Sequence, residues 1–121
     1  MVFSFDNNSP IYLQIIEQIK IQIISGKLKP GERLPSVRDL AVETKVNPNT
    51  MQKAMTELEE QGLIYTERTN GKFVTNDTCL LLEFKKTHAK ELSIKFIKDM
   101  QAIGYTTEEA LNYIKDIGGN R

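Results

Sequence analysis

The residues of this chain that could bind a polyanion are cations, and they gather in one stretch of the sequence. Between residues 27 and 53 basic side chains outnumber acidic ones by six to three: Lys27, Lys29, Arg33, Arg38, Lys45 and Lys53 against Glu32, Asp39 and Glu43. Residues 54 to 67 carry only acidic side chains, namely Glu57, Glu59, Glu60 and Glu67. The 121-residue chain has 16 basic and 16 acidic residues, so its net charge is zero. The positive stretch is thus followed by an acidic one, and this negative far end weakens non-specific attraction to nucleic acid and leaves binding more reliant on specific contacts.

Two short helices are predicted to position these side chains. Ser36 is a favoured N-cap with Asp39 three residues on, the spacing of a capping box, so a helix is expected to start near Val37. Residues 44–46 then leave room only for a tight corner. Asn47 is a second favoured cap, and Pro48 suits the first helical position.

The second of these helices has two distinct faces. Its predicted buried face follows the spacing i, i+3, i+4, i+7: Met51, Ala54, Met55 and Leu58. Polar side chains are left facing outward: Asn49, Thr50, Gln52, Lys53 and Thr56. Gly62 is expected to close the helix through a left-handed conformation.

A hairpin and a supporting helix complete the expected domain. Residues 63–68 and 72–75 are rich in β-formers, and Thr69-Asn70-Gly71 between them suits a tight turn. Residues 10–25 repeat isoleucine at i, i+4 spacing, with Ser9 as the expected cap and Gly26 as the end. Three helices followed by a glycine-tipped hairpin predict a mainly α fold with a small β-hairpin, a winged helix-turn-helix, and DNA as the first partner to test.

The same residues carry a family resemblance. The strings are SPIYLQI at residues 9–15, GKLKPGERLPSVRDLA at 26–41, VNPNT at 46–50 and LEEQGLI at 58–64. Together, over residues 9 to 75, they resemble the N-terminal domain of GntR-family bacterial transcription regulators.

The resemblance implies roles for individual residues. The arginine of the Leu-Pro-Ser-x-Arg motif, here Arg38, contacts DNA in the family, although Asp39 or Glu43 could pair with it instead. Gln52 and Pro48 stand where relatives often have arginine. Because glutamine tends to read adenine and arginine guanine, the base contacted by Gln52 is expected to be adenine. Gly71 matches the wing glycine, unless it serves the turn alone. The candidate DNA-binding residues are Arg33, Ser36, Arg38, Asn47, Asn49, Thr50, Gln52, Lys53, Arg68, Gly71 and Lys72.

The remaining residues, 76–121, read as two helices that follow the domain at residues 1–75. One is expected over residues 78–103, and a capping box of Thr106 with Glu109 starts another that stops at Gly118-Gly119. Two helices alone cannot bury so many apolar residues, so a second subunit is expected to cover them. This tail resembles the short dimerisation arm of the YtrA-type GntR subfamily. The candidate dimerisation residues are Leu81, Phe84, Leu92, Phe96, Met100, Ile103, Leu111 and Ile114.

Enzyme and membrane signatures are missing from the sequence. One His and one Cys supply neither a zinc site nor a Cys/His nucleophile pair, so we expect no enzyme activity, metal or cofactor. Cys79 is expected to be an unpaired structural thiol. The first eight residues lack the features of a signal peptide, and no stretch reaches about 18 apolar residues. The expected location is the cytoplasm.

The sequence therefore favours a homodimeric repressor that binds a palindromic operator, double-stranded DNA with one half-site per subunit. The subfamily resemblance implies control of an adjacent transporter operon. A ligand-responsive variant stays open, with a small effector between the tail helices. Tyr12, Tyr105 and Tyr113 could line an effector pocket, although aromatic packing at a helix interface explains these tyrosines better. A rival interpretation is a winged-helix protein-interaction module, which the neutral net charge supports.

Overall fold

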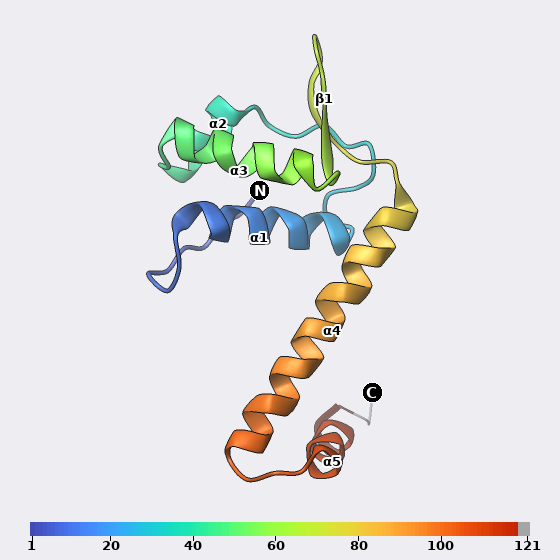
Figure 1. Cartoon of the computed structure of the whole chain (residues 1–121). Coiled ribbons are helices and arrows are strands. Elements are labelled where there is room, and N and C mark those ends of the chain that lie inside the picture. The colour runs from blue at the N-terminus through green and yellow to red at the C-terminus, as the bar shows by residue number, and fades with distance from the viewer. Residues whose placement is uncertain (119–121) are drawn as a thin grey trace. The chain divides into compact units, whose positions relative to one another are not determined.

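The computed structural model describes residues 1–118 and forms two compact units, which we treat separately (Figure 1). The N-terminal unit is Met1–Phe84, and the C-terminal unit begins at Lys85. The elements are α1 (Ile11–Ile24), α2 (Val37–Thr44), α3 (Pro48–Glu60), β1 (Ile64–Glu67), β2 (Gly71–Val74), α4 (Thr78–Ala102) and α5 (Thr107–Gly118). The expected helix stop includes Gly119, which lies outside the described residues. No helix within residues 1–118 is both long and apolar enough to cross a membrane.

Helix α1 lies beneath α3 in the N-terminal unit and supplies part of its core. Ile15, Ile19 and Ile23 are buried as predicted, whereas Ile11 is 36% exposed. The expected Ser9 cap is wrong. Pro10 is the N-cap and provides no side-chain hydrogen bond, while the Ser9 carbonyl accepts a hydrogen bond from Gln14 Nε2 at 2.7 Å.

An extended segment before α1 is held by glutamines on that helix. Gln18 Nε2 donates to the Ser4 carbonyl at 2.6 Å, and its Oε1 accepts from the Ser4 amide at 2.9 Å. Gln14 makes the same pair of bonds with the Asp6 backbone, at 2.9 and 3.0 Å. Gln22 Nε2 donates to the Val2 carbonyl at 3.5 Å. Three apolar residues of this segment, Met1, Phe3 and Phe5, pack against the core of the N-terminal unit.

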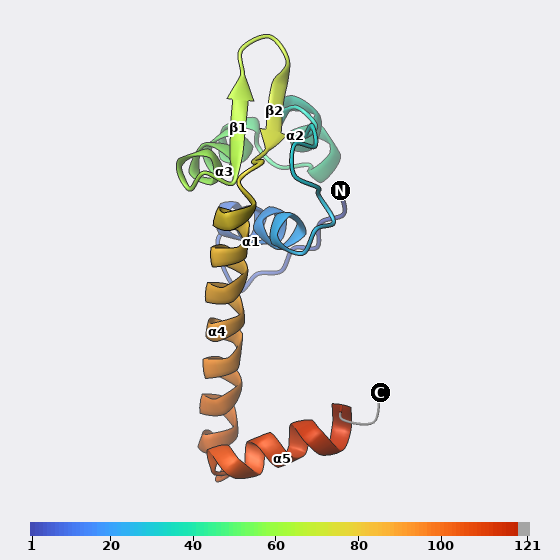
Figure 2. The ribbon, with the colours of Figure 1, turned by 90° about the vertical axis from the view of Figure 1, so that its right-hand side faces the viewer.

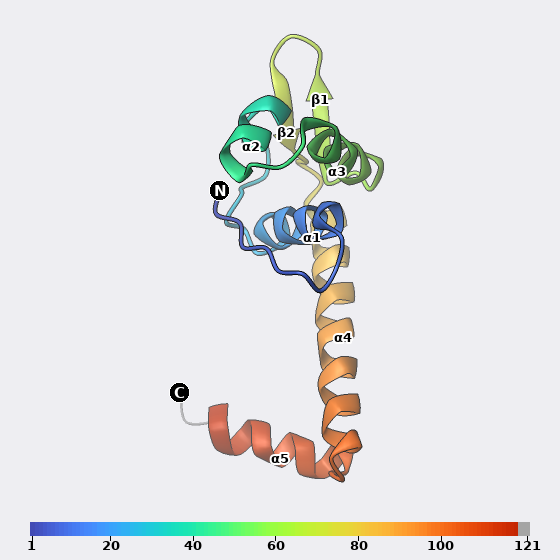
Figure 3. The ribbon, with the colours of Figure 1, turned by 90° about the vertical axis from the view of Figure 1, so that its left-hand side faces the viewer.

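Helices α2 and α3 form the helix-turn-helix, and their predicted caps are confirmed (Figure 3). Ser36 Oγ accepts from the Asp39 amide at 3.0 Å, and Asn47 Oδ1 accepts from the Asn49 amide at 2.8 Å. Lys45 adopts a left-handed conformation (φ 58°) at the corner, which lets the chain reverse between the helices. The predicted core face of α3 is confirmed, since all four of its apolar residues are buried.

The wing is the β1–β2 hairpin, with the register Ile64↔Val74 to Glu67↔Gly71 (Figure 2). Strand β1 is shorter than predicted because Leu63 and Arg68 lie outside it, and β2 is shifted by one residue, beginning at Gly71 and ending at Val74. Gly71 has φ +104°, which explains the glycine at this position. The sequence did not indicate that residues 31–34 lie along the other edge of β2. The Leu34 amide donates to the Lys72 carbonyl at 2.8 Å, and the Val74 amide donates to the Glu32 carbonyl at 2.9 Å.

The first turns of α4 belong to the N-terminal unit. Asp77 Oδ1 accepts from the Leu80 amide at 3.0 Å and so caps the start of the helix. Leu81 and Phe84 pack against the core of the unit, and Lys20 Nζ lies 4.8 Å from the centroid of the Phe84 ring. We expected Leu81 and Phe84 in the dimerisation arm and a boundary after residue 75, but their contacts join them to the N-terminal unit instead.

The C-terminal unit contains the rest of α4 and all of α5. The predicted capping box is confirmed: the Thr106 amide donates to Glu109 Oε1 at 3.0 Å, and the Glu109 amide donates to Thr106 Oγ1 at 3.1 Å. Gly104 turns the chain between the helices with φ +100°. No side chain of α4 is buried, and Ala110 is the one buried residue of α5 within the described residues. This unit therefore has almost no core of its own.

Candidate nucleic-acid interface

The exposed face of α3 is the centre of the candidate interface. Asn49, Gln52 and Thr56 are exposed, while Met51 and Met55 on the opposite face are fully buried. Gln52 Nε2 donates to Thr56 Oγ1 at 3.1 Å. One amide hydrogen and the carbonyl oxygen of Gln52 remain available, and these are the groups that pair with adenine N7 and N6. Thr56 therefore orients Gln52, a role that the i, i+4 spacing could have indicated.

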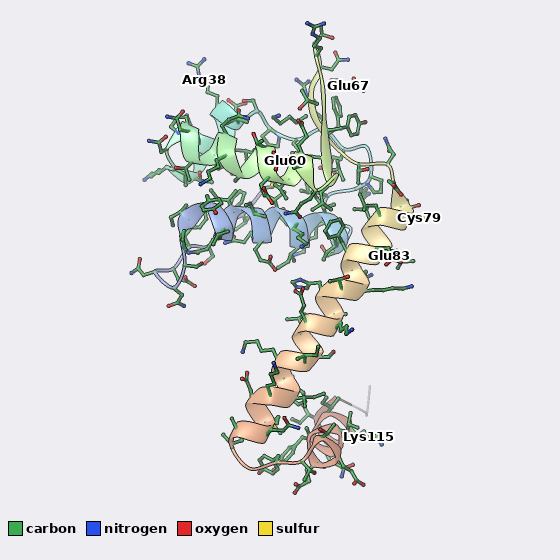
Figure 4. The ribbon with its side chains drawn as sticks, viewed as in Figure 1. Arg38, Glu60, Glu67, Cys79, Glu83 and Lys115 are labelled. Atoms are coloured by element: carbon green, nitrogen blue, oxygen red, sulfur yellow. The ribbon has the colours of Figure 1, made fainter. Side chains whose placement is uncertain are left out.

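Arg38 is the second residue of α2, and its side chain points away from the ribbon toward solvent (Figure 4). In that view the wing extends to the same side of the N-terminal unit. Neither Asp39 nor Glu43 forms a salt bridge with Arg38 in the described structure. A guanidinium with no ion pair is free to bind a phosphate in bidentate fashion.

Ser36 and Asn47 serve primarily as caps. Their side-chain oxygens accept backbone hydrogen bonds at the starts of α2 and α3, as described above. The other backbone amides of each first turn can donate hydrogen bonds to an anion, and the partial positive charge of the helix N-terminus favours such binding. Thr50 lies in this first turn of α3 and is half-buried.

Lys53 is exposed, but its ammonium lies 4.1 Å from the centroid of the Tyr12 ring. This cation–π contact joins α3 to α1, which packs beneath it (Figure 3). The contact contributes about 0.5–1 kcal/mol at an exposed site. Lys53 thus has a weak structural partner, Tyr12, that the sequence did not indicate. Tyr12 belongs to the N-terminal unit, whereas the other two candidate effector-pocket tyrosines, Tyr105 and Tyr113, belong to the C-terminal unit.

Two arginines lie at the wing. Arg68 is exposed in the turn between the strands. The Arg33 side chain lies against Gly71, where an added Cβ atom would be 3.4 Å from Arg33 Nε. The positive φ explains the glycine, whereas a Cβ atom here would only touch the Arg33 side chain at ordinary contact distance. Arg33, which comes from a separate stretch of sequence, thus lies at the wing beside Gly71.

Lys72 differs from the other candidates because its ammonium is already bound. Its Nζ donates to Thr66 Oγ1 at 2.9 Å and lies 3.6 Å from Glu59 Oε1. The Thr66 hydroxyl donates in turn to the same Glu59 oxygen. Glu59 belongs to the acidic end of α3 that the sequence predicted, but its partners lie on the wing.

No group of three or more His, Cys, Asp or Glu residues within residues 1–118 could hold a metal ion. Cys79 is an exposed free thiol.

Comparisons with known proteins agree with this geometry. The family model described as bacterial regulatory proteins, gntR family, matches residues 11–74. The HTH-type transcriptional repressor YtrA of Bacillus subtilis is 41% identical to this chain, over a match that covers 94% of this chain and 88% of YtrA. A GntR family transcriptional regulator from Listeria monocytogenes superposes with a TM-score of 0.86 at 39% identity, over 93% of this chain and 99% of that one.

A solved complex with DNA resembles the N-terminal part of the chain. The AraR DNA-binding domain in complex with operator ORX1 superposes with a TM-score of 0.56 at 30% identity, over 62% of this chain and 96% of that one. These likenesses cover the helix-turn-helix and the wing that hold the candidate residues. The chain belongs to the GntR family of bacterial transcription regulators, with YtrA-type relatives, and its winged helix-turn-helix is a DNA-binding domain.

Proposed function

We propose that the protein is a homodimeric repressor that binds a palindromic operator, with one recognition helix in each half-site. The observation that carries the proposal is the two-faced helix α3. Its apolar face is fixed in the core by Met51 and Met55, so its polar face, with Asn49 and Gln52, stays exposed and rigidly placed. A rigid polar helix face beside an unpaired arginine is suited to the major groove.

Each candidate residue takes a part in this proposal. Arg38 binds a backbone phosphate and sets the register of α3 in the groove. Gln52, oriented by Thr56, reads an adenine in the major groove. Arg33 and Arg68 bring positive charge to the wing, which follows the adjacent minor groove or its phosphates. The first-turn amides that Ser36 and Asn47 organise add neutral donors to phosphate.

The C-terminal unit is proposed to form the dimer. Apolar side chains on its two helices are strongly exposed, with 58% of Leu92, 71% of Ile103 and 50% of Ile114 accessible. A second copy would cover these residues, together with Phe96, Met100 and Leu111. Leu81 and Phe84 contribute little to such an interface because they pack on the core of the N-terminal unit.

Repression and the target gene rest on the relatives. YtrA is named a repressor, and occupancy of promoter DNA by a dimer is a direct means of repression. The YtrA-type resemblance also favours a neighbouring transporter operon as the target.

A small-molecule effector is a second candidate, favoured by one cavity in the C-terminal unit. The cavity has a volume of about 500 Å³ and is lined mostly by apolar residues: Phe96, Met100, Ile103, Tyr105, Tyr113, Ile114, Ile117 and Gly118. The Tyr105 and Tyr113 hydroxyls lie 3.1 Å apart at this cavity. Their hydrogen bond raises the pKa of Tyr105 above its usual value, so the Tyr105 hydroxyl stays neutral at pH 7. Lowered operator affinity in the presence of a small apolar alcohol or phenol would support the effector.

The test of the main proposal is selection from a random duplex library with the purified full-length protein. The expected result is an inverted repeat whose half-site centres lie about 10 bp or a multiple apart. Enrichment of a single half-site would contradict the dimer but keep the DNA-binding role. Absence of any preferred sequence would favour the protein-interaction module.

A further inference from the structure

Three side chains from three elements of the N-terminal unit form a closed triangle. Glu59 comes from the last turn of α3, Thr66 from β1 and Lys72 from β2. Thr66 and Lys72 are partners in the hairpin register, so the lysine reaches the hydroxyl directly across the strands. The carboxylate of Glu59 accepts from Thr66 and lies 3.6 Å from the ammonium of Lys72. The triangle joins both strands of the wing to the end of α3.

The position of Glu59 on the helix gives the triangle its relevance to DNA. Glu59 follows Gln52 by seven residues, or two helical turns, so both lie on the same side of α3. The wing is thereby attached to the side of the helix that carries the base-reading amide.

The ammonium of Lys72 is poorly available to DNA. The side chain is only 17% exposed, in contrast to the exposed Arg68 in the wing turn. Moving the ammonium outward to a phosphate would take it away from both Thr66 and Glu59. Such a move would leave the Glu59 carboxylate without its cation beside a polyanion, which is unfavourable.

We infer that Lys72, Thr66 and Glu59 form a clamp that fixes the angle of the wing against the recognition helix, and that Lys72 is a positioning residue, not a phosphate contact. This inference rests on the proposed function, because the clamp matters only where helix and wing bind one duplex. By holding the wing, the clamp places Arg33 and Arg68 before DNA arrives, and binding then loses less conformational freedom.

The clamp predicts an effect opposite in sign to simple electrostatics. Removing an acidic residue from a DNA-binding domain ordinarily strengthens binding, because one repulsive charge is lost. Glu59→Gln should instead weaken operator binding about 3- to 10-fold, the scale of one coupled polar pair. Glu60→Gln is the matched control. Glu60 is the adjacent exposed acid. Its side chain takes part in no hydrogen bond or ion pair among the described residues, and its loss should leave affinity unchanged or slightly raised.

Two further variants separate the clamp from a phosphate contact. Lys72→Gln should weaken binding by a similar factor without changing the dependence of log affinity on log salt. A phosphate contact would lower that slope by about 0.9. Thr66→Val keeps every charge and suits a strand, so weaker binding by this variant is expected from the clamp alone.

The experiment measures operator affinity of the full-length protein and these variants from low to moderate salt, with urea unfolding of each. In the double variant Glu59→Gln/Lys72→Gln, affinity and unfolding free energy should match either single variant, since one clamp is lost in each. Tighter binding by Glu59→Gln, a lowered slope for Lys72→Gln or additive losses would each overturn the clamp. If the wild-type protein showed no sequence-specific binding, the proposed function itself would be wrong. The triangle would still be supported in that case if the double variant and the two single variants had equal unfolding free energies.

Discussion

The two units of this chain solve the problem of burial differently. In the N-terminal unit, α1, α2, α3 and the wing surround a continuous core that includes the fully buried Ile15, Leu40, Met55 and Leu58. In the C-terminal unit Ala110 is the one buried apolar residue among those described. A unit that buries so little surface cannot offset the entropy of ordering its chain. From this comparison we expect the N-terminal unit to fold by itself, and we propose that the C-terminal unit is completed by a partner.

The difference originates in the patterns of the helices. Helix α3 collects its apolar residues on one stripe and leaves the other side polar. In the part of α4 that belongs to the C-terminal unit, Leu92 and Ile94 are exposed while Phe96 and Ile97 are half-buried. Apolar residues on several sides of one helix require more than one neighbour.

The largest effect is expected where the C-terminal unit meets its proposed partner. Phe96→Asp should convert the dimer to a monomer, because each buried apolar side chain contributes about 1.5–3 kcal/mol and twofold symmetry counts the loss twice. Operator affinity should fall with dimerisation, since a monomer reads one half-site. Sedimentation velocity at micromolar concentration measures the first effect, and Thr87→Asp at an exposed position of α4 controls for the added charge. A dimeric Phe96→Asp variant would place the interface elsewhere, for instance on exposed residues of α1.

The independence of the N-terminal unit can be tested in a fragment of residues 1–84. The fragment should unfold cooperatively in urea, and Met55→Ala should lower its unfolding free energy by about 2–5 kcal/mol through loss of a fully buried side chain. Val42→Ala is the control, because Val42 is 74% exposed and its loss should change stability by less than about 0.5 kcal/mol. A fragment without a cooperative transition would remove the contrast between the units.

Arg38→Ala should separate binding from assembly. Operator affinity is expected to fall by about 1–3 kcal/mol through loss of a charge-assisted contact, while the sedimentation coefficient stays that of the dimer. Titration of labelled operator at fixed salt measures the change. Unaltered affinity would exclude Arg38 from the interface.

Gln52→Arg should alter which base is read with little change in overall affinity. The preference at one position of each half-site should move toward guanine, with a discrimination of about 1–3 kcal/mol. Repeating the random-duplex selection with this variant measures the shift. An unchanged motif would mean that Gln52 does not contact that base.

The smallest contrast compares two expected helix caps, one in each unit. Thr106→Ala should lower the unfolding free energy by about 1 kcal/mol, because it removes a cap whose reciprocal bond is formed. Ser9→Ala should be nearly neutral, because the Ser9 hydroxyl caps nothing. Thermal unfolding of both variants decides the comparison, and equal losses would contradict it.

These two caps also show what the sequence could and could not predict. Local signals were reliable: Ser36, Asn47 and Thr106 cap helices where their spacing indicated, and the core stripe of α3 is confirmed. The Ser9 prediction failed because the helix starts one residue later: Pro10 takes the N-cap position, and its ring has no hydrogen-bonding group. Ser9 is bound through its backbone carbonyl, which accepts from Gln14.

For the candidate site, residue types were easier to predict than partners. The cations of the helix-turn-helix and wing could be named from composition and resemblance. The contacts of Lys53 with Tyr12 and of Lys72 with Glu59 join elements distant in sequence, so no local pattern reveals them. For the same reason the start of α4 could not be assigned to the N-terminal unit from periodicity alone.

The glutamines of α1 have a consequence for engineering the N-terminus. Four residues of helix rise about 6.0 Å, and two residues of extended chain span about 6.6 Å. The spacing of Gln14, Gln18 and Gln22 therefore matches that of alternate residues in the extended segment before α1. Their partners are Asp6, Ser4 and Val2. Inserting or deleting one residue between Val2 and Asp6 would exchange the inward-facing and outward-facing residues of this extended segment. Phe3 or Phe5 would then face water. An affinity tag joined before Met1 preserves this spacing, whereas one that replaces the first residues removes it.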